Sequence, residues 1–237
     1  DLAGHLQDPP YSVNVVVDNT PPVSVANLDG TPGSGGWYVS PVTLGIVSSD
    51  ATSGVKAIYY RLGTGDWITY TAPVQFTANG NHALSYYALD QAGNMEGIHS
   101  LSLMIDTLAP VTIGALTGTQ GGSGWYRSPV VATLTAIDTT SGVQVIYYSL
   151  NAGPWTPYTG PLSISEQGIH SLVYYARDNA GNTEGTHAQS VKVDTIPPTV
   201  TITTPTAGQV VSATAILIQG SAGDDAGSGI AAVDISI

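Results

Sequence analysis

The sequence predicts an all-β protein made of tandem β-sandwiches with about seven strands each. Short runs of alternating apolar and polar residues are separated by segments rich in Gly, Pro, Asn, Asp and Ser, and no window shows a helical period. A pattern of 88 residues is then written twice without a gap, with about 40 identical positions. A repeat of that length is long enough to form a domain of its own.

The repeats begin at an Asp-x-x-x-Pro segment, found at Asp18, Asp106 and Asp194. This spacing predicts the following domains: residues 1–17, the C-terminal strand of a preceding repeat; 18–105 and 106–193, two full repeats; and 194–237, the N-terminal half of a further, divergent repeat. We expect the chain to be a window on a longer polypeptide. The alternative is a protomer whose segment 11–17 completes the half-repeat of a neighbour by strand addition.

Within a repeat, each strand is indicated by its pattern and by the residues around it. The clearest predicted strands of the first full repeat are residues 43–48, 55–62, 82–89 and 100–105. Pro22, Pro41 and Pro73 stand at strand starts, where a missing N–H is tolerated. Seven strands in fewer than 100 residues are typical of an immunoglobulin-like (fibronectin-III-like) sandwich.

Alternation also assigns the faces of the strands. Leu89 of the first repeat is replaced by Arg177 in the second, which marks that face as the solvent side, so Tyr86 and Tyr174 point inwards. The same reasoning from the position of Arg61 places the tyrosine at 60 inside and the tyrosine at 59 outside. Because the third and sixth strands are neighbours in this fold, two outward pairs are expected side by side, and they are proposed as surface contacts: Tyr59 with Tyr87, and Tyr147 with Tyr175.

A series of motifs carries a family resemblance. The motifs are WYxSPV at 37–42, DxxSGV at 50–55, IYYxL at 58–62, GxW at 65–67, GxHxLxYYAxDxAGNxE at 80–96 and DTxxP at 106–110. In this order they resemble the bacterial Ig-like repeats strung along large secreted and surface-anchored proteins. Such repeats serve adhesins, S-layers, filaments and enzyme spacers alike, so the resemblance implies a fold more than a function. Residues 201–219 resemble a different Ig-like subtype.

Composition excludes several classes of function. The chain has 17 acidic and 5 basic residues and a net charge of -12, so no basic stripe is present to bind nucleic acid or an anionic membrane. No apolar run approaches the ~18 residues that a membrane span needs. The low charged fraction of 9%, with abundant Thr, Ser, Gly, Tyr and Asn, favours an extracellular or cell-surface location.

The aspartates are the strongest chemical signal. They recur at matching places in the repeats, and the candidate set is Asp18, Asp50, Asp90, Asp106, Asp138, Asp178, Asp194 and Asp225. In an immunoglobulin-like sandwich, the three positions of one repeat lie at the same pole, and no basic residue is repeated to balance them. Oxygen ligands alone are the set that calcium takes, so calcium is the one candidate cofactor. The alternative is that the aspartates cap turns by accepting backbone hydrogen bonds.

Other candidate sites are weaker. The four tryptophans could stack on sugars, although a tryptophan in a small sandwich usually lies in the core or covers an edge. His82 and His170 are repeated without a repeated nucleophile, and no catalytic motif occurs, so the chain is not expected to be an enzyme.

The expected function is structural: a segment of an extracellular prokaryotic surface protein that forms a semi-rigid rod, filament, stalk or layer. The alternatives are an adhesin or carbohydrate-binding module and a spacer that carries an enzyme. The expected partners are other copies of the chain or other surface proteins, with glycans as a further class.

Overall fold

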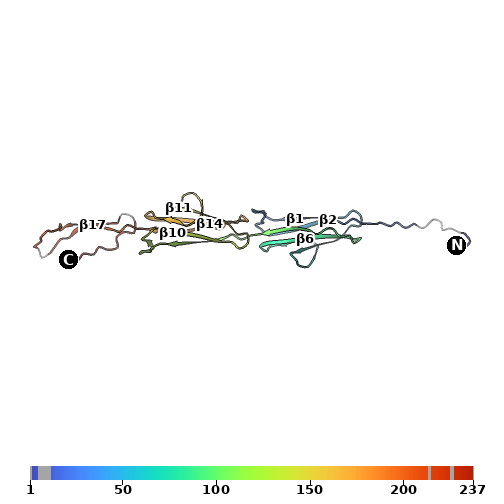
Figure 1. Ribbon diagram of the computed structural model, residues 1–237, viewed down its shortest axis with the longest axis horizontal. Coiled ribbons are helices and arrows are strands. Elements are labelled where there is room, and N and C mark those ends of the chain that lie inside the picture. Colours follow the sequence, from blue (N-terminus) through green and yellow to red (C-terminus); the bar gives the residue numbers. More distant parts are fainter. Residues whose placement is uncertain (1, 5–11, 213–214, 225–226, 237) are drawn as a thin grey trace. The chain divides into compact units, whose positions relative to one another are not determined.

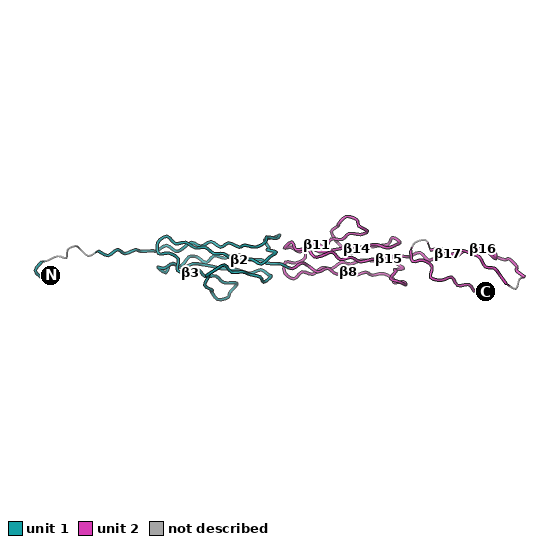
Figure 2. Tube along the Cα trace, turned by 180° about the vertical axis from the view of Figure 1, so that it is seen from behind, with its two compact units in different colours: residues 1–107 teal, residues 108–237 magenta. Residues whose placement is uncertain are grey.

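The computed structural model of the protein describes residues 2–4, 12–212, 215–224 and 227–236, and this part of the chain consists of strands, turns and loops. It divides into two compact units, residues 1–107 and 108–237, which Figure 2 shows in different colours. The described residues include no helix that is long and apolar enough to cross a bilayer. The predicted all-β fold class is confirmed.

Unit 1 is a sandwich of two antiparallel sheets. Its strands are β1 (Val23–Asp29), β2 (Val42–Ser49), β3 (Val55–Leu62), β4 (Ile68–Tyr70), β5 (Val74–Phe76), β6 (Gly80–Asp90) and β7 (His99–Ile105). One sheet has the order β1-β2-β5 and the other the order β4-β3-β6-β7. Pro22, Pro41 and Pro73 stand immediately before β1, β2 and β5, as predicted.

The core of unit 1 follows the predicted alternation. Leu44 on β2 packs against Leu84 and Tyr86 on β6 and against Tyr60 on β3, and all four side chains are buried. In the register of β3 and β6, residue 60 pairs with residue 86, so two inward tyrosines lie next to each other. The prediction that these tyrosines point into the core is confirmed.

Unit 2 begins with a second sandwich of the same kind (Figure 1). Its strands are β8 (Val111–Thr117), β9 (Trp125–Tyr126), β10 (Val130–Ile137), β11 (Val143–Leu150), β12 (Thr156–Pro157), β13 (Leu162–Ile164), β14 (Gly168–Asp178) and β15 (His187–Val193). The smaller sheet has the order β13-β10-β8, and the larger has the order β12-β11-β14-β15-β9. β9 and β12 are strands of two residues that the sequence pattern did not reveal.

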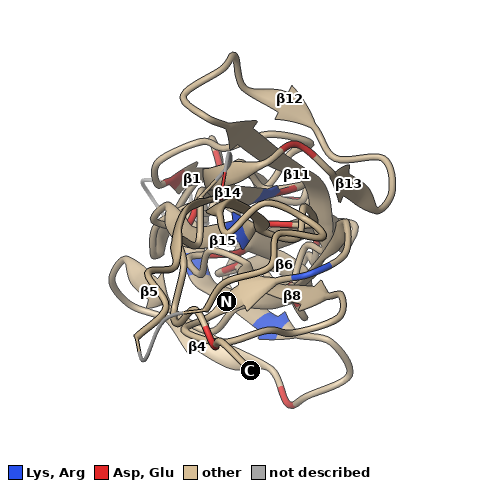
Figure 3. Ribbon diagram, turned by 90° about the vertical axis from the view of Figure 1, so that its left-hand side faces the viewer, with Lys and Arg blue, Asp and Glu red and all other residues tan. Residues whose placement is uncertain are grey.

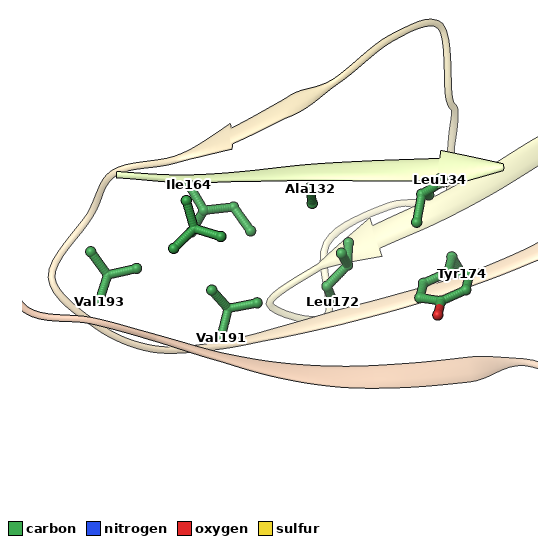
Figure 4. Packing of buried hydrophobic residues seen from close by; sticks show 8 residues of the cluster. Ala132, Leu134, Ile164, Leu172, Tyr174, Val191 and Val193 are labelled. Atoms are coloured by element: carbon green, nitrogen blue, oxygen red, sulfur yellow. The ribbon is translucent and has the colours of Figure 1, made fainter. Parts of the chain in front are cut away.

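The core of this second sandwich lies between its two sheets. In Figure 4, Ala132 and Leu134 of β10 point towards Leu172 and Tyr174 of β14, and these side chains are buried together. Val191 of β15 closes the same cluster. Tyr174 is 4% exposed, which confirms its predicted inward direction.

The third repeat contributes a short hairpin to unit 2. β16 (Thr199–Thr204) pairs with β17 (Gln219–Gly223), and the apolar side chains of Val200, Ile202 and Ile216 are exposed. At the other end of the chain, the predicted strand over residues 11–17 is not formed in the described residues. Tyr11 lies outside them, and residues 12–17 have no strand assignment.

Candidate functional site

Three carboxylates meet at one pole of unit 1. Asp18 precedes β1, Asp50 follows β2 and Asp90 ends β6, and their carboxylate oxygens lie within 4.8 Å of one another. The topology explains this. β1 is antiparallel to β2, and β6 is antiparallel to β3, so the start of β1 and the ends of β2 and β6 share one end of the sandwich.

Asp50 holds the turn between β2 and β3. Its Oδ1 accepts hydrogen bonds from the backbone N–H groups of Thr52 at 3.2 Å, Ser53 at 2.9 Å and Gly54 at 2.7 Å. Gly54 has a φ of 82°, a left-handed conformation that glycine adopts without strain. The Asp-x-x-Ser-Gly motif is therefore a turn whose orphan donors converge on one carboxylate oxygen.

Asp90 holds the turn after β6 through Asn94. The carboxylate accepts the backbone N–H of Asn94 at 2.8 Å on Oδ1 and its side-chain amide at 2.8 Å on Oδ2. The same amide donates to the backbone carbonyl of Asp18 at 3.1 Å. Asn94 thus ties the residues before β1 to the turn after β6.

Asp18 completes the connections at this pole. Its Oδ1 accepts the N–H of Thr20 at 3.0 Å, and its Oδ2 accepts the N–H of Ser53 at 3.1 Å. The pKa of Asp18 lies below its ordinary value, first because the Ser53 hydroxyl donates to the carboxylate and then because of the backbone N–H of Thr20. The ionised form is therefore the one that these donors hold.

The second repeat builds the same turns. Oδ1 of Asp138 accepts the N–H of Gly142 at 2.6 Å, and Asp178 accepts the N–H and the side-chain amide of Asn182, each at 2.8 Å. Asp106 directly follows β7 and is buried, and its N–H donates to the carbonyl of Tyr38 at 2.9 Å. When the two repeats are aligned, Asp106 occupies the position of Asp18, and Asp138 and Asp178 occupy the positions of Asp50 and Asp90.

The third repeat keeps part of this arrangement and corrects one residue. Asp194 accepts the N–H of Ser228 at 3.2 Å, and its pKa lies below its ordinary value, chiefly because the Ser228 hydroxyl donates to it. Asp224 accepts the N–H of Gly229 at 2.7 Å. The comparison between repeats had not selected this aspartate as a candidate. Asp225, the candidate chosen from the sequence, lies outside the described residues.

In this geometry the aspartate carboxylates cap the turns at the pole. The carboxylates of the pole accept converging N–H groups, which satisfies backbone donors that a turn would otherwise leave without a partner. The same three carboxylates also retain the all-oxygen donor set that calcium prefers, at separations that one cation could bridge. Calcium binding at this pole is therefore a proposal.

A buried glutamate is a feature that the sequence reasoning missed. Glu96 is 5% exposed and accepts the N–H of Ser24 on β1 at 3.0 Å and the N–H of Ala88 on β6 at 2.6 Å. Since β1 and β6 belong to opposite sheets, one carboxylate joins the two layers of the sandwich. Nε2 of His99 lies 3.2 Å from the same carboxylate, and its ring stacks on Tyr86 at 4.8 Å.

The second repeat contains the same connection. Glu184 accepts the N–H of Thr112 at 3.0 Å and the N–H of Ala176 at 2.7 Å, and it also accepts the Thr112 hydroxyl. Burial alone raises the pKa of Glu184, but the hydrogen bonds from Thr112 and His187 outweigh it, so the net pKa is lowered. The repetition of both Glu and His at this spacing was the signal that could have revealed the connection.

The outward tyrosines form an aromatic cluster on the larger sheet of each sandwich. In unit 1 the rings of Tyr59 and Tyr87 stack with centres 5.1 Å apart, and Trp67 meets Tyr87 edge-on at 4.6 Å. The guanidinium group of Arg61 lies 4.4 Å above the Trp67 ring. The predicted side-by-side position of the tyrosines is confirmed, while their role as a contact surface remains a proposal.

The corresponding cluster of unit 2 has the same frame. Tyr147 and Tyr175 pair across β11 and β14 with ring centres 5.4 Å apart, and Trp155 meets Tyr175 edge-on at 4.8 Å. Ser149 takes the place of the arginine of unit 1, and its hydroxyl donates to the carbonyl of Gly153 at 2.7 Å. We call Tyr147, Trp155 and Tyr175 the outer aromatic cluster of repeat 2.

The remaining candidates have local structural partners. Nε2 of His82 lies 2.9 Å from the carbonyl of Ala78, and Nε2 of His170 lies 2.8 Å from the carbonyl of Glu166. Both histidines thus fix the turn that leads into their strand. Figure 3 shows how few segments carry Lys or Arg compared with Asp or Glu, in keeping with 5 basic and 17 acidic residues.

Two solved structures of bacterial proteins are similar to this chain. The chain is similar to the fibronectin(III)-like modules of CbhA from Clostridium thermocellum, with 13% identity and a TM-score of 0.34 over 71% of this chain and 94% of that one. It is also similar to a structure of a 1.5-MDa bacterial ice-binding adhesin studied for host cell surface retention, with 15% identity and a TM-score of 0.35 over 79% of this chain and 71% of that one.

Two further comparisons address the sequence itself. A search of curated proteins finds no match. The family model described as bacterial Ig domain matches residues 198–237, the segment in which the sequence departs from the two full repeats. The strand order and register of the two full repeats are those of Ig-like β-sandwiches, and the match at residues 198–237 agrees with this fold class.

Proposed function

We propose that this chain is a non-catalytic structural segment of an extracellular prokaryotic surface protein, in which tandem Ig-like repeats form a semi-rigid rod, filament, stalk or layer. Its partners would be further copies of the chain or other surface proteins. The bacterial Ig match and the polar, weakly charged composition support the surface location.

One observation supports stiffness more than any other. Asp194 is the residue directly after β15 of the second repeat, and its carboxylate accepts the N–H of Ser228 in the third repeat. The five residues between β15 and β16 include Pro197 and Pro198, which restrict the backbone further. A connection with a side-chain hydrogen bond across it and two prolines within it is expected to bend less than a Gly/Ser linker.

Spin-label distances test this proposal. The chain has no cysteine, so Ser190→Cys on β15 and Thr201→Cys on β16 can be labelled selectively at exposed sites. We expect a narrow distance distribution by pulsed electron paramagnetic resonance, which Asp194→Ala should broaden. Asp66→Ala, an exposed aspartate of unit 1, is the matched control and should change nothing. A broad distribution in the parent chain would contradict the proposal.

A further inference from the structure

The outer aromatic cluster of repeat 2 forms the floor of an open hollow of about 440 Å³. Tyr147, Trp155 and Tyr175 all line it, and Trp155 is 46% exposed. The volume falls within the roughly 300–1,000 Å³ that is common for small-molecule sites. A partly exposed indole set edge-on to one of two paired tyrosine rings provides an apolar surface in contact with solvent.

Polar side chains surround this aromatic floor. Arg177, Thr183 and Thr186 line the same hollow, and all three are exposed. Arginine offers several N–H donors in a planar fork, and each threonine hydroxyl can donate and accept. An aromatic surface with a few directional polar groups at its rim is the usual composition of a site that orients a small ligand.

The first repeat has the same aromatic frame but a different rim. The equivalents of Arg177, Thr183 and Thr186 are Leu89, Met95 and Ile98, so the rim is apolar there. The Trp67 ring of the first repeat is also covered on one side by the Arg61 guanidinium, a contact that Ser149 cannot make in the second. The aromatic residues thus occur in both repeats and accompany the shared fold, whereas the polar residues around them occur in repeat 2 and are replaced by apolar residues in repeat 1.

We propose that this hollow binds a neutral sugar residue of a glycan. A pyranose ring has an apolar face of C–H groups and a periphery of hydroxyls, which match the aromatic floor and the polar rim. The ring would stack on the exposed indole of Trp155, and Arg177 and the two threonines would hydrogen-bond the hydroxyls. Glu184 lies in the same lining as Arg177, and the chain carries a net charge of -12, so an anionic sugar gains no net attraction.

The test uses the whole chain with three soluble neutral probes: cellohexaose, maltohexaose and hexa-N-acetylchitohexaose. Each is titrated to about 10 mM, which detects dissociation constants in the millimolar range, while NMR shifts and tryptophan fluorescence are followed. We expect at least one probe to bind. Trp155→Ala should weaken that binding at least about tenfold, and Trp67→Ala, the matched change in the first repeat, should leave it unchanged.

A second variant transfers the rim of the first repeat onto the second. Arg177→Leu, Thr183→Met and Thr186→Ile together should abolish binding while the thermal unfolding curve stays close to that of the parent, because all three positions are exposed. The inference is overturned if no neutral probe binds, if binding is confined to oligogalacturonate included as the acidic probe, or if Trp155→Ala and Trp67→Ala weaken it equally. These outcomes leave the structural function untouched, since that rests on the connection at Asp194.

Discussion

At the scale of single residues, two adjacent tyrosines on β6 have opposite environments. Tyr86 is 7% exposed, and its hydroxyl accepts the N–H of Ala26 on the facing sheet at 3.3 Å. Tyr87 lies on the outer face against Tyr59 and Trp67. The same pair of environments recurs on β14, where Tyr174 is buried in the core and Tyr175 lies on the outer face.

Tyr86→Ala should therefore destabilise the first sandwich by about 3 kcal/mol or more, as other large aromatic truncations in cores do. Tyr87→Ala is the matched control and should cost about 1 kcal/mol or less, since it loses only ring contacts at the surface. Urea unfolding followed by tryptophan fluorescence measures both. An equal loss of unfolding free energy in the two variants would contradict the assignment of one tyrosine to the core and the other to the surface.

Glu184 gives the second sandwich a specific dependence on pH. Its pKa is lowered in the folded protein, so its contribution to the free energy of unfolding is present above its unfolded pKa of about 4.3 and is lost as pH falls through the folded value. A protonated carboxyl would give up its strong acceptor role towards the N–H groups of Thr112 and Ala176.

Glu184→Gln should accordingly lower the stability of the second sandwich at pH 7 by about 1–3 kcal/mol, because buried donors lose a charged acceptor. The difference between variant and parent should shrink as the pH falls below the unfolded pKa of about 4.3 and through the lowered folded pKa, because the parent carboxylate then also loses its charge. Denaturant unfolding at pH 7 and pH 3 checks both statements. A variant that remains less stable by the same amount at both values would show that the charge of Glu184 is irrelevant.

At the scale of elements, the turns that bring Asp18, Asp50 and Asp90 together at one pole of the sandwich form the candidate calcium site. The hypothesis that calcium binds there predicts that chelation lowers the melting temperature of residues 18–193. At a calcium concentration about 100-fold above the dissociation constant, binding would add about 2.7 kcal/mol to a domain. Asp50→Asn and Asp138→Asn should reduce the response to chelation, because each removes the charge of one ligand.

Differential scanning calorimetry with EDTA and with added calcium measures this response. Asp66→Ala, which lies away from the pole, is the control and should respond to chelation as the parent does. Superimposable melting curves with and without chelator would leave turn capping as the only role of these aspartates.

Strands and their faces were predictable because they depend on local pattern. The change from Leu89 to Arg177 alone identified the solvent face of two strands, and the burial of Tyr86 and Tyr174 agrees with it. The two-residue strands β9 and β12 were missed because each exists only through pairing with a neighbour, β15 in one case and β11 in the other. Pairing partners of such short segments leave no periodicity in the sequence.

The polar network was less predictable than the strands. The recurrence of Glu96 and His99 as Glu184 and His187 marks these residues in the sequence, but it does not identify β1 as the strand that the carboxylate reaches. Its partner there is a backbone N–H, which every residue other than proline has, and no sequence pattern marks it. In the third repeat, Asp224 and Asp225 are adjacent, and only the direction of the backbone shows that Asp224 holds the N–H of Gly229.

At the scale of the whole molecule, the two full repeats should unfold as separate domains. Each has its own buried core, and the described clusters of one repeat share no residue with those of the other. Stretching the chain from its ends should therefore give two main unfolding events of similar size. Each repeat of 88 residues releases roughly 290–320 Å of extended chain, less the length of the folded repeat.

Single-molecule force spectroscopy measures these increments. Tyr86→Ala should weaken one event and leave the other unchanged, which assigns the events to repeats. One event of about twice the length would show instead that the repeats unfold as a single cooperative body.

The hydrogen bond between Asp194 and Ser228 has an evolutionary consequence. Asp194 directly follows the last strand of the second repeat and opens the Asp-x-x-x-Pro segment of the third, and the turn that donates the N–H lies later in that third repeat, which departs in sequence from the two full repeats. Any copy that begins with the Asp-x-x-x-Pro segment and carries the Ser-Gly turn therefore brings a compatible joint with it. Gene duplication or unequal recombination could lengthen, shorten or shuffle such an array without the need for a new interface at each junction.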